Sequence, residues 1–97
     1  MFNLTNEQIE IVKEILKRFL EDQKVWVFGS RIKKICKPYA DLDLVIVSEL
    51  PTPTLTIALL REAFSESNLP FKVDILDWAS LSENFRQVIL AEYLAIN

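Results

Sequence analysis

The chain has 97 residues and a mass of 11.3 kDa, a length that predicts a single domain over residues 1–97. Its 11 Lys and Arg against 14 Asp and Glu give a net charge of -3, which argues against direct nucleic-acid binding. With no histidine and only Cys36 as a cysteine, the chain has no His-based catalytic triad, His-ligated zinc or internal disulfide.

The expected secondary structure alternates between helices and short strands. Two capping-box patterns, Thr5 with Gln8 and Ser80 with Glu83, indicate helix starts. The run at residues 25–28 is apolar without polar alternation, which is typical of a strand covered on both faces. The order predicts an α/β (α+β) fold in which helices flank a small central mixed sheet. The expected elements are helix 6–21, strand 25–28, short helix or turn 31–36, strand 41–47, helix 54–67, strand 71–76 and helix 81–93.

Acidic residues at the start of the second expected strand are the most informative feature. Residues two apart in a strand share a face, so Asp41 and Asp43 project together, with Cα atoms about 6.5–7 Å apart. Their repulsion needs compensation, for which Mg²⁺ is the simplest candidate. Asp74, between Val73 and Ile75 in the next strand, would be costly to bury unpaired. Three converging carboxylates would suit a two-metal site for phosphoryl displacement. The alternative is that Asp41 and Asp43 only form the polar start of a strand and have no function.

The single glycine, Gly29, directly follows an apolar strand and precedes Ser30. A glycine permits close backbone approach, and the serine adds a hydroxyl, so this turn suits a phosphate group. A lone glycine also excludes the GxGxxG fingerprint and the GxxxxGK phosphate loop. By composition alone, Gly-Ser is an ordinary turn, and the basic residues after it form a solvated helix face: Arg31, Lys33, Lys34 and Lys37.

Together these residues form a GS-x10-DxD pattern between two expected strands. The segment VFGSRIKKICKPYADLDLVIV resembles the minimal nucleotidyltransferases of the DNA polymerase β superfamily, and the order of elements is similar along the whole chain. The resemblance implies a polymerase-β-like core whose catalysis depends on Mg²⁺, with two ions expected. It also implies the following roles: Gly29 and Ser30 bind the triphosphate, Arg31 contacts phosphate, Asp41, Asp43 and Asp74 hold the metal, and Asp74 acts on the nucleophile.

Two positions depart from the family pattern. Lys34 stands where a second glycine often follows GS, and Tyr39 lies where small residues often precede DxD. A bulkier loop would narrow the nucleotide pocket, whereas the lysine could instead add a phosphate contact. Asp77 is also acidic, but three residues along a strand reverse the face, so we exclude it from the site.

The resemblance also predicts a partner. Stand-alone members of this size are typically antitoxins of HEPN-domain ribonuclease toxins, which implies transfer of AMP from ATP to a tyrosine of such a toxin. The alternative is a nucleotidyltransferase fold that neutralises its partner by contact alone, a hypothesis that Lys34 favours. An aminoglycoside or tRNA nucleotidyltransferase is disfavoured because we find neither an acceptor domain nor a basic RNA-binding face.

The high apolar content of the chain also favours a partner protein. Hydrophobic residues make up 51% of the chain and the mean hydropathy is +0.19, so some apolar surface is expected to stay exposed. An exposed apolar patch predicts a partner interface, although scattered exposed residues are the alternative. No signal peptide or membrane-length apolar run is present, so we expect a cytoplasmic protein without membrane contact.

Overall fold

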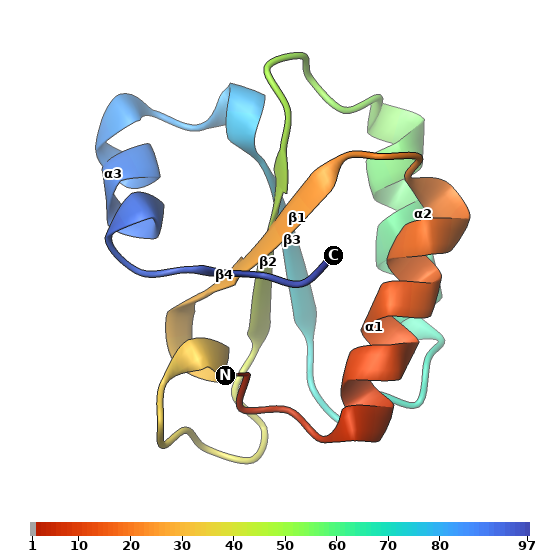
Figure 1. Cartoon of the computed structure of the whole chain (residues 1–97). Helices are drawn as coiled ribbons and strands as arrows, with labels where there is room; N and C mark the ends of the chain where they lie inside the picture. Colours follow the sequence, from red (N-terminus) through yellow and green to blue (C-terminus); the bar gives the residue numbers. More distant parts are fainter. Residues whose placement is uncertain (1) are drawn as a thin grey trace.

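A computed structural model describes residues 2–97, in which helices lie on both faces of a four-stranded sheet (Figure 1). This architecture confirms the predicted fold class. No helix within residues 2–97 has the length and apolar character needed to cross a membrane. The elements in chain order are α1 (Asn6–Phe19), β1 (Lys24–Phe28), the 3-10 helix η1 (Gly29–Ile32), β2 (Leu42–Val47), α2 (Thr54–Ser65), β3 (Val73–Asp77), the 3-10 helix η2 (Trp78–Ser80), α3 (Glu83–Ala91) and β4 (Leu94–Ala95).

The sheet is mixed, with the strand order β3-β2-β1-β4. Strand β1 runs antiparallel to both β2 and β4, whereas β2 and β3 are parallel and are connected by α2. A parallel pair needs a crossover of this kind because the chain must return to the same end of the sheet. Since β3 is the terminal strand, its outer edge has no strand partner among the described residues.

The two faces of the sheet are covered differently. Helices α1 and α2 lie on one face and α3 on the other (Figure 1). Alternate β2 residues point to opposite faces, so Leu42, Leu44 and Ile46 belong to the large core under α1 and α2. Val45 instead joins a smaller cluster that includes Ile89 of α3. Asp43, the one carboxylate of β2, therefore belongs to the face that α3 covers.

The helix starts confirm one capping prediction and correct the other. Thr5 Oγ1 accepts a hydrogen bond from the Gln8 amide at 3.1 Å, and Gln8 Oε1 accepts one from the Thr5 amide at 2.9 Å. The predicted cap Ser80 was wrong, because it lies in η2 and α3 begins after Ser82, whose hydroxyl accepts from the Phe85 amide at 3.2 Å. The helices also end earlier than predicted, and the two-residue strand β4 was not anticipated.

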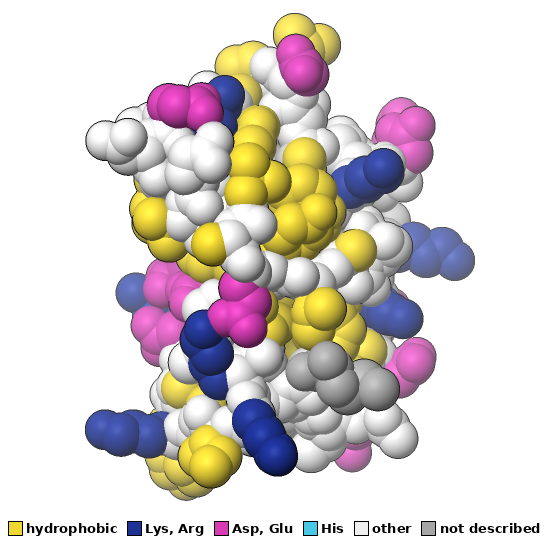
Figure 2. Space-filling model, turned by 60° about the vertical axis from the view of Figure 1, so that its left-hand side comes forward, with side chains coloured by type: hydrophobic (Ala, Val, Ile, Leu, Met, Phe, Trp, Pro, Cys, Tyr) yellow, Lys and Arg dark blue, Asp and Glu magenta, His cyan; other side chains and the backbone are white. Residues whose placement is uncertain are grey.

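Large apolar side chains remain exposed on several elements, as the composition predicted. Figure 2 shows apolar side chains gathered near the middle of the visible face, with acidic and basic side chains around them. The exposed set comprises Ile35, Tyr39, Leu50, Leu55, Leu59, Val88, Leu90 and Tyr93.

Candidate active site

Two of the predicted carboxylates are direct neighbours across the sheet. Asp43 of β2 is in register with Asp74 of β3. Side chains at paired positions of adjacent strands project to the same face, so both lie on the side that α3 covers. Asp41 lies one residue before β2, on an exposed segment. Asp77 points to the other face and accepts hydrogen bonds from the Thr52 amide at 2.9 Å and its hydroxyl at 3.0 Å, as its exclusion from the site requires.

The charges of this cluster repel one another. Burial raises the pKa of the Asp43 carboxyl above its ordinary value of 3.8, and the nearby charges of Asp74 and Asp41 raise this pKa further. Asp74 has a cationic neighbour on its own segment, since Lys72 Nζ lies 3.3 Å from its Oδ1. Asp43 has no such partner within salt-bridge distance among the described residues. Asp43 is therefore the carboxylate that would gain most from a bound cation.

The donor set fits a hard divalent cation in its chemistry. Aspartate oxygens are the ligands that Mg²⁺ prefers, and a cation at this point would relieve the repulsion that acts on Asp43. As the side chains are placed, no three Asp, Glu, Cys or His side chains within residues 2–97 converge closely enough to hold a metal ion. The arrangement is thus a facing pair, Asp43 and Asp74, with Asp41 on the adjacent exposed segment.

Gly29 lies directly against Asp43. The register of β1 with β2 places Phe28 opposite Asp43, so the turn that follows β1 passes beside the carboxylate. Gly29 has a φ of 77°, and a Cβ at this position would lie 2.5 Å from Asp43 Oδ2. Both the positive φ and the lack of space require glycine here. The turn therefore brings its backbone at Gly29 close to the Asp43 carboxylate, with Ser30 as the next residue.

Arg31 is buried and makes several contacts within the protein. Its side chain is only 4% exposed, and its guanidinium lies over the Phe71 ring, 4.2 Å from the ring centroid. It donates hydrogen bonds to the carbonyl oxygens of Ala40 at 2.8 Å and Pro38 at 2.8 Å, and to that of Asn3 at 3.2 Å. Through these contacts the guanidinium holds the loop that leads into β2. The phosphate contact implied for this residue stays a prediction.

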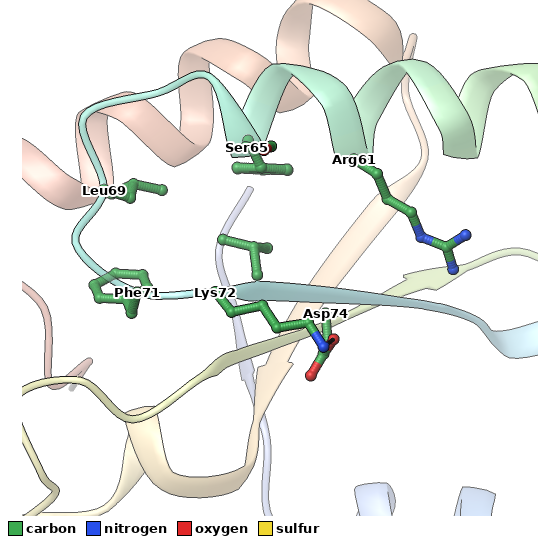
Figure 3. Close-up of a pocket in the computed structure, with 8 residues that line it drawn as sticks. Arg61, Ser65, Leu69, Phe71, Lys72 and Asp74 are labelled. Carbon is green, nitrogen blue, oxygen red and sulfur yellow. Dashed lines mark ion pairs between the residues drawn. The ribbon is translucent and has the colours of Figure 1, made fainter.

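Two cavities meet beside the third carboxylate. One, of about 380 Å³, is lined by Phe28, Asp43, Arg61, Asp74, Ile75, Leu76 and Phe85. The other, of about 610 Å³, lies between α2 and the outer edge of β3, and it shares Arg61 and Asp74 with the first (Figure 3). Sequence reasoning missed Arg61 and Lys72 as residues near the site. An exposed cation on a helix or strand end carries no sequence signal that separates it from ordinary surface charge.

The bulky residues that depart from the family pattern lie away from these cavities. Lys34 and Tyr39 are both exposed, and neither lines the two cavities that share Asp74. Tyr39 instead lines a separate cavity with Arg31 and Pro38. The larger side chains of this loop therefore do not narrow the space beside Asp43 and Asp74.

Comparison with known proteins identifies the family. A family model described as nucleotidyltransferase domain matches residues 9–96. The chain belongs to the nucleotidyltransferase domain family. This nucleotidyltransferase is 50% identical over 94 residues to the probable protein adenylyltransferase MntA of Haemophilus influenzae, a match that spans 97% of this chain and 82% of the relative.

Two solved structures share the fold of this nucleotidyltransferase at 18% identity. One is a complex of a tri-AMPylated HEPN toxin from Shewanella oneidensis with an MNT antitoxin, with a TM-score of 0.69 over 92% of this chain and 68% of the other. The second is a crystal structure from Shewanella oneidensis, with a TM-score of 0.70 over 96% of this chain and 72% of the other. These likenesses confirm the predicted nucleotidyltransferase core.

Proposed function

We propose that this nucleotidyltransferase is a Mg²⁺-dependent protein adenylyltransferase and an antitoxin. It transfers AMP from ATP to a tyrosine hydroxyl of a HEPN-domain ribonuclease toxin in the cytoplasm and thereby silences the toxin. Residues 1–97 act as one minimal nucleotidyltransferase domain that forms a hetero-oligomer with this partner.

The facing pair of Asp43 and Asp74 beside Gly29 carries this proposal. Nucleotidyl transfer needs carboxylates at a point where the backbone comes close enough to hold phosphate oxygens, and these residues provide both. The 50% identity to a probable protein adenylyltransferase, over nearly the whole chain, supports the choice of AMP and of a protein acceptor. The structural likeness to an MNT antitoxin supports the fold on which that choice depends.

The residues around the carboxylates have distinct tasks in the proposed reaction. Asp41, Asp43 and Asp74 would hold Mg²⁺, which neutralises phosphate charge when bound. The Gly29 backbone and the Ser30 hydroxyl donate hydrogen bonds to the triphosphate, which orients the α-phosphorus toward the acceptor. Asp74 accepts the proton of the attacking hydroxyl. The acceptor oxygen forms a bond to the α-phosphorus, and the bond from that phosphorus to the β-bridging oxygen breaks, releasing diphosphate with the electron pair.

A labelled transfer experiment tests this function. The protein is incubated with ATP labelled at the α-phosphate, Mg²⁺ and the HEPN-domain protein encoded beside it, and the label on each protein is measured. We expect label on the partner, located on tyrosine by mass spectrometry, and loss of the label when Asp41→Asn and Asp43→Asn are combined. A partner that stays unlabelled with the wild-type protein would contradict the proposal.

The exposed apolar side chains favour a second candidate, neutralisation by contact alone. Residues such as Leu55, Val88 and Tyr93 provide surface for a partner without any chemistry. Ribonuclease activity of the partner separates the candidates. If Asp41→Asn with Asp43→Asn still neutralises the ribonuclease as well as the wild type does, contact suffices; if neutralisation is lost while the complex still forms, transfer is required.

A further inference from the structure

Apart from Asp74, the residues that line the larger of the two cavities have no part in the roles assigned so far. It runs along the outer edge of β3, with Leu69 and Phe71 at one end and Arg61 and Asp74 at the other (Figure 3). The smaller cavity reaches the same Asp74 from the side of Asp43. Asp74 therefore stands between two spaces, of which only one contains the neighbouring carboxylate Asp43.

The lining of the larger cavity changes character along its length. Phe64, Leu69, Phe71 and Val73 provide apolar and aromatic surface away from the carboxylate. The end near Asp74 carries two cations, Arg61 and Lys72. Figure 3 shows the Lys72 side chain reaching Asp74, whereas the Arg61 side chain extends from α2 toward the strand, with its guanidinium farther from the carboxylate. An apolar wall that ends in cations beside a carboxylate suits a ring with a hydroxyl at its tip, because ring and hydroxyl each meet a matching surface.

The open edge of β3 adds a way to hold an extended chain. The Leu42 amide donates to the Lys72 carbonyl oxygen at 2.9 Å, so the backbone groups of Lys72 face β2. Backbone groups alternate in direction along a strand, so those of Val73 face the outer edge, where the cavity lies. An extended segment can therefore hydrogen-bond to this edge while its side chain enters the cavity.

We propose that this cavity is the acceptor subsite, which receives a tyrosine side chain on an extended segment of the protein substrate. The inference rests on the proposed function and names the place where its acceptor binds. In-line displacement requires the nucleophile and the leaving group on opposite sides of the α-phosphorus. The nucleotide lies on the Gly29 and Asp43 side of Asp74, and the tyrosine approaches from the β3 edge.

Residues at the point where the two cavities meet accept the proton and stabilise the charge that the reaction produces. The tyrosine hydroxyl gives its proton to the Asp74 carboxylate as its oxygen bonds to the α-phosphorus, and diphosphate leaves with the electron pair. Arg61 and Lys72 stabilise the negative charge that develops on the phenolic oxygen. Lys72 is already placed for this task, since its Nζ lies 3.3 Å from Asp74 Oδ1.

Filling the cavity with a large side chain tests the inference. Ser65 is exposed on α2 and lines the cavity, so Ser65→Trp obstructs it without disturbing the core. Glu62→Trp is the matched control, because Glu62 is exposed on the same helix and lines neither cavity beside Asp74. We expect Ser65→Trp to lower AMP transfer to the HEPN-domain partner by about 10²-fold, a loss typical of a misplaced reactant, and Glu62→Trp to change it less than about threefold.

Two further measurements separate this inference from the proposed function. The affinity for ATP with Mg²⁺, and the slow transfer of AMP to water, should be the same in Ser65→Trp as in the wild type. Undiminished transfer to the partner by Ser65→Trp would overturn the subsite, as would an equal loss in Glu62→Trp or a parallel loss of nucleotide affinity. Failure of the wild-type protein to label its partner would instead overturn the proposed function itself.

Discussion

The two faces of the sheet carry different kinds of side chain, although the same strands form both faces. Under α1 and α2, Leu42, Leu44 and Ile46 of β2 are almost completely buried and pack into a continuous apolar core. On the face that α3 covers, β2 places Asp43 in register with Asp74 of β3. One side therefore consists of apolar contacts, whereas the other includes a repelling pair of carboxylates that line a cavity.

This difference explains how a chain of 97 residues can contain both a stable core and a candidate active site. Because side chains alternate along a strand, one strand can pack a core and present ligands at the same time. The apolar face supplies most of the burial that stabilises the fold, and this stability tolerates the cost of the carboxylate pair on the other face. Substitutions on the two faces should accordingly affect different properties.

The largest effect is expected from Asp43→Asn. Removing the negative charge at the centre of the site should lower AMP transfer by about 10³-fold. The same change should raise the melting temperature without divalent cations, because burial and the neighbours Asp74 and Asp41 disfavour the charged form of Asp43. Transfer assays and thermal melts of the same preparation measure both. Unchanged transfer, or a clear drop in melting temperature, would contradict the division between the faces.

Leu44→Ala should show the reverse pattern. Leu44 is fully buried among the residues that pack under α1 and α2, so its truncation leaves a cavity and should cost about 2–5 kcal/mol of unfolding free energy. Transfer per folded molecule should stay close to that of the wild type at a temperature where the variant remains folded. Urea denaturation and activity normalised to the folded fraction measure the two quantities. If Leu44→Ala lost AMP transfer but kept the stability of the wild type, the two faces would not have separate roles.

Gly29→Ala should have a smaller effect on both properties. An alanine at a φ of 77° is strained, and its Cβ would displace the Asp43 carboxylate, so we expect a loss of about 1–3 kcal/mol together with reduced transfer. Ser30→Ala is the matched control, since it removes only a hydroxyl from the adjacent position. Equal stability of the two variants in urea denaturation would contradict the requirement for glycine.

The smallest effect is a pH dependence of stability. The pKa of Asp43 is raised in the folded protein, so its ionisation destabilises the fold as pH rises from the ordinary value of 3.8 through the raised value. Relative to Asp43→Asn, wild-type stability without divalent cations should fall across this interval and then stay constant. Denaturation of both proteins at several pH values measures the difference. A difference that does not change with pH would show that the carboxyl is not perturbed.

Much of this organisation could be predicted from the sequence because it depends on local rules. The capping box at Thr5 and Gln8 places the start of α1, and period-two alternation places Asp43 opposite to Leu44. The exclusion of Asp77 follows from the same alternation, and its hydrogen bonds to Thr52 agree with it. The sequence also predicted that Asp43 and Asp74 converge from neighbouring strands, but their exact register depends on the parallel pairing of β2 with β3.

The features that the sequence did not predict depend on tertiary contacts. Strand β4 has only two residues and exists through its pairing with β1, which no local pattern encodes. The basic stretch around Arg31 indicates a surface cation, but in the fold the Arg31 guanidinium donates to carbonyl groups of the loop before β2. Arg61 joins the site only because α2 lies along the edge of β3, where the two cavities meet.

Two aspartates of β3 allow a direct test of whether AMP transfer depends on the sheet face that carries Asp43. Asp74 and Asp77 lie on the same strand but point to opposite faces. The measurement is the transfer of α-labelled AMP to the HEPN-domain partner by Asp74→Asn and by Asp77→Asn. We expect a loss of about 10³-fold for Asp74→Asn and near wild-type transfer per folded molecule for Asp77→Asn. Retained transfer by Asp74→Asn, or an equal loss in both variants, would contradict this expectation.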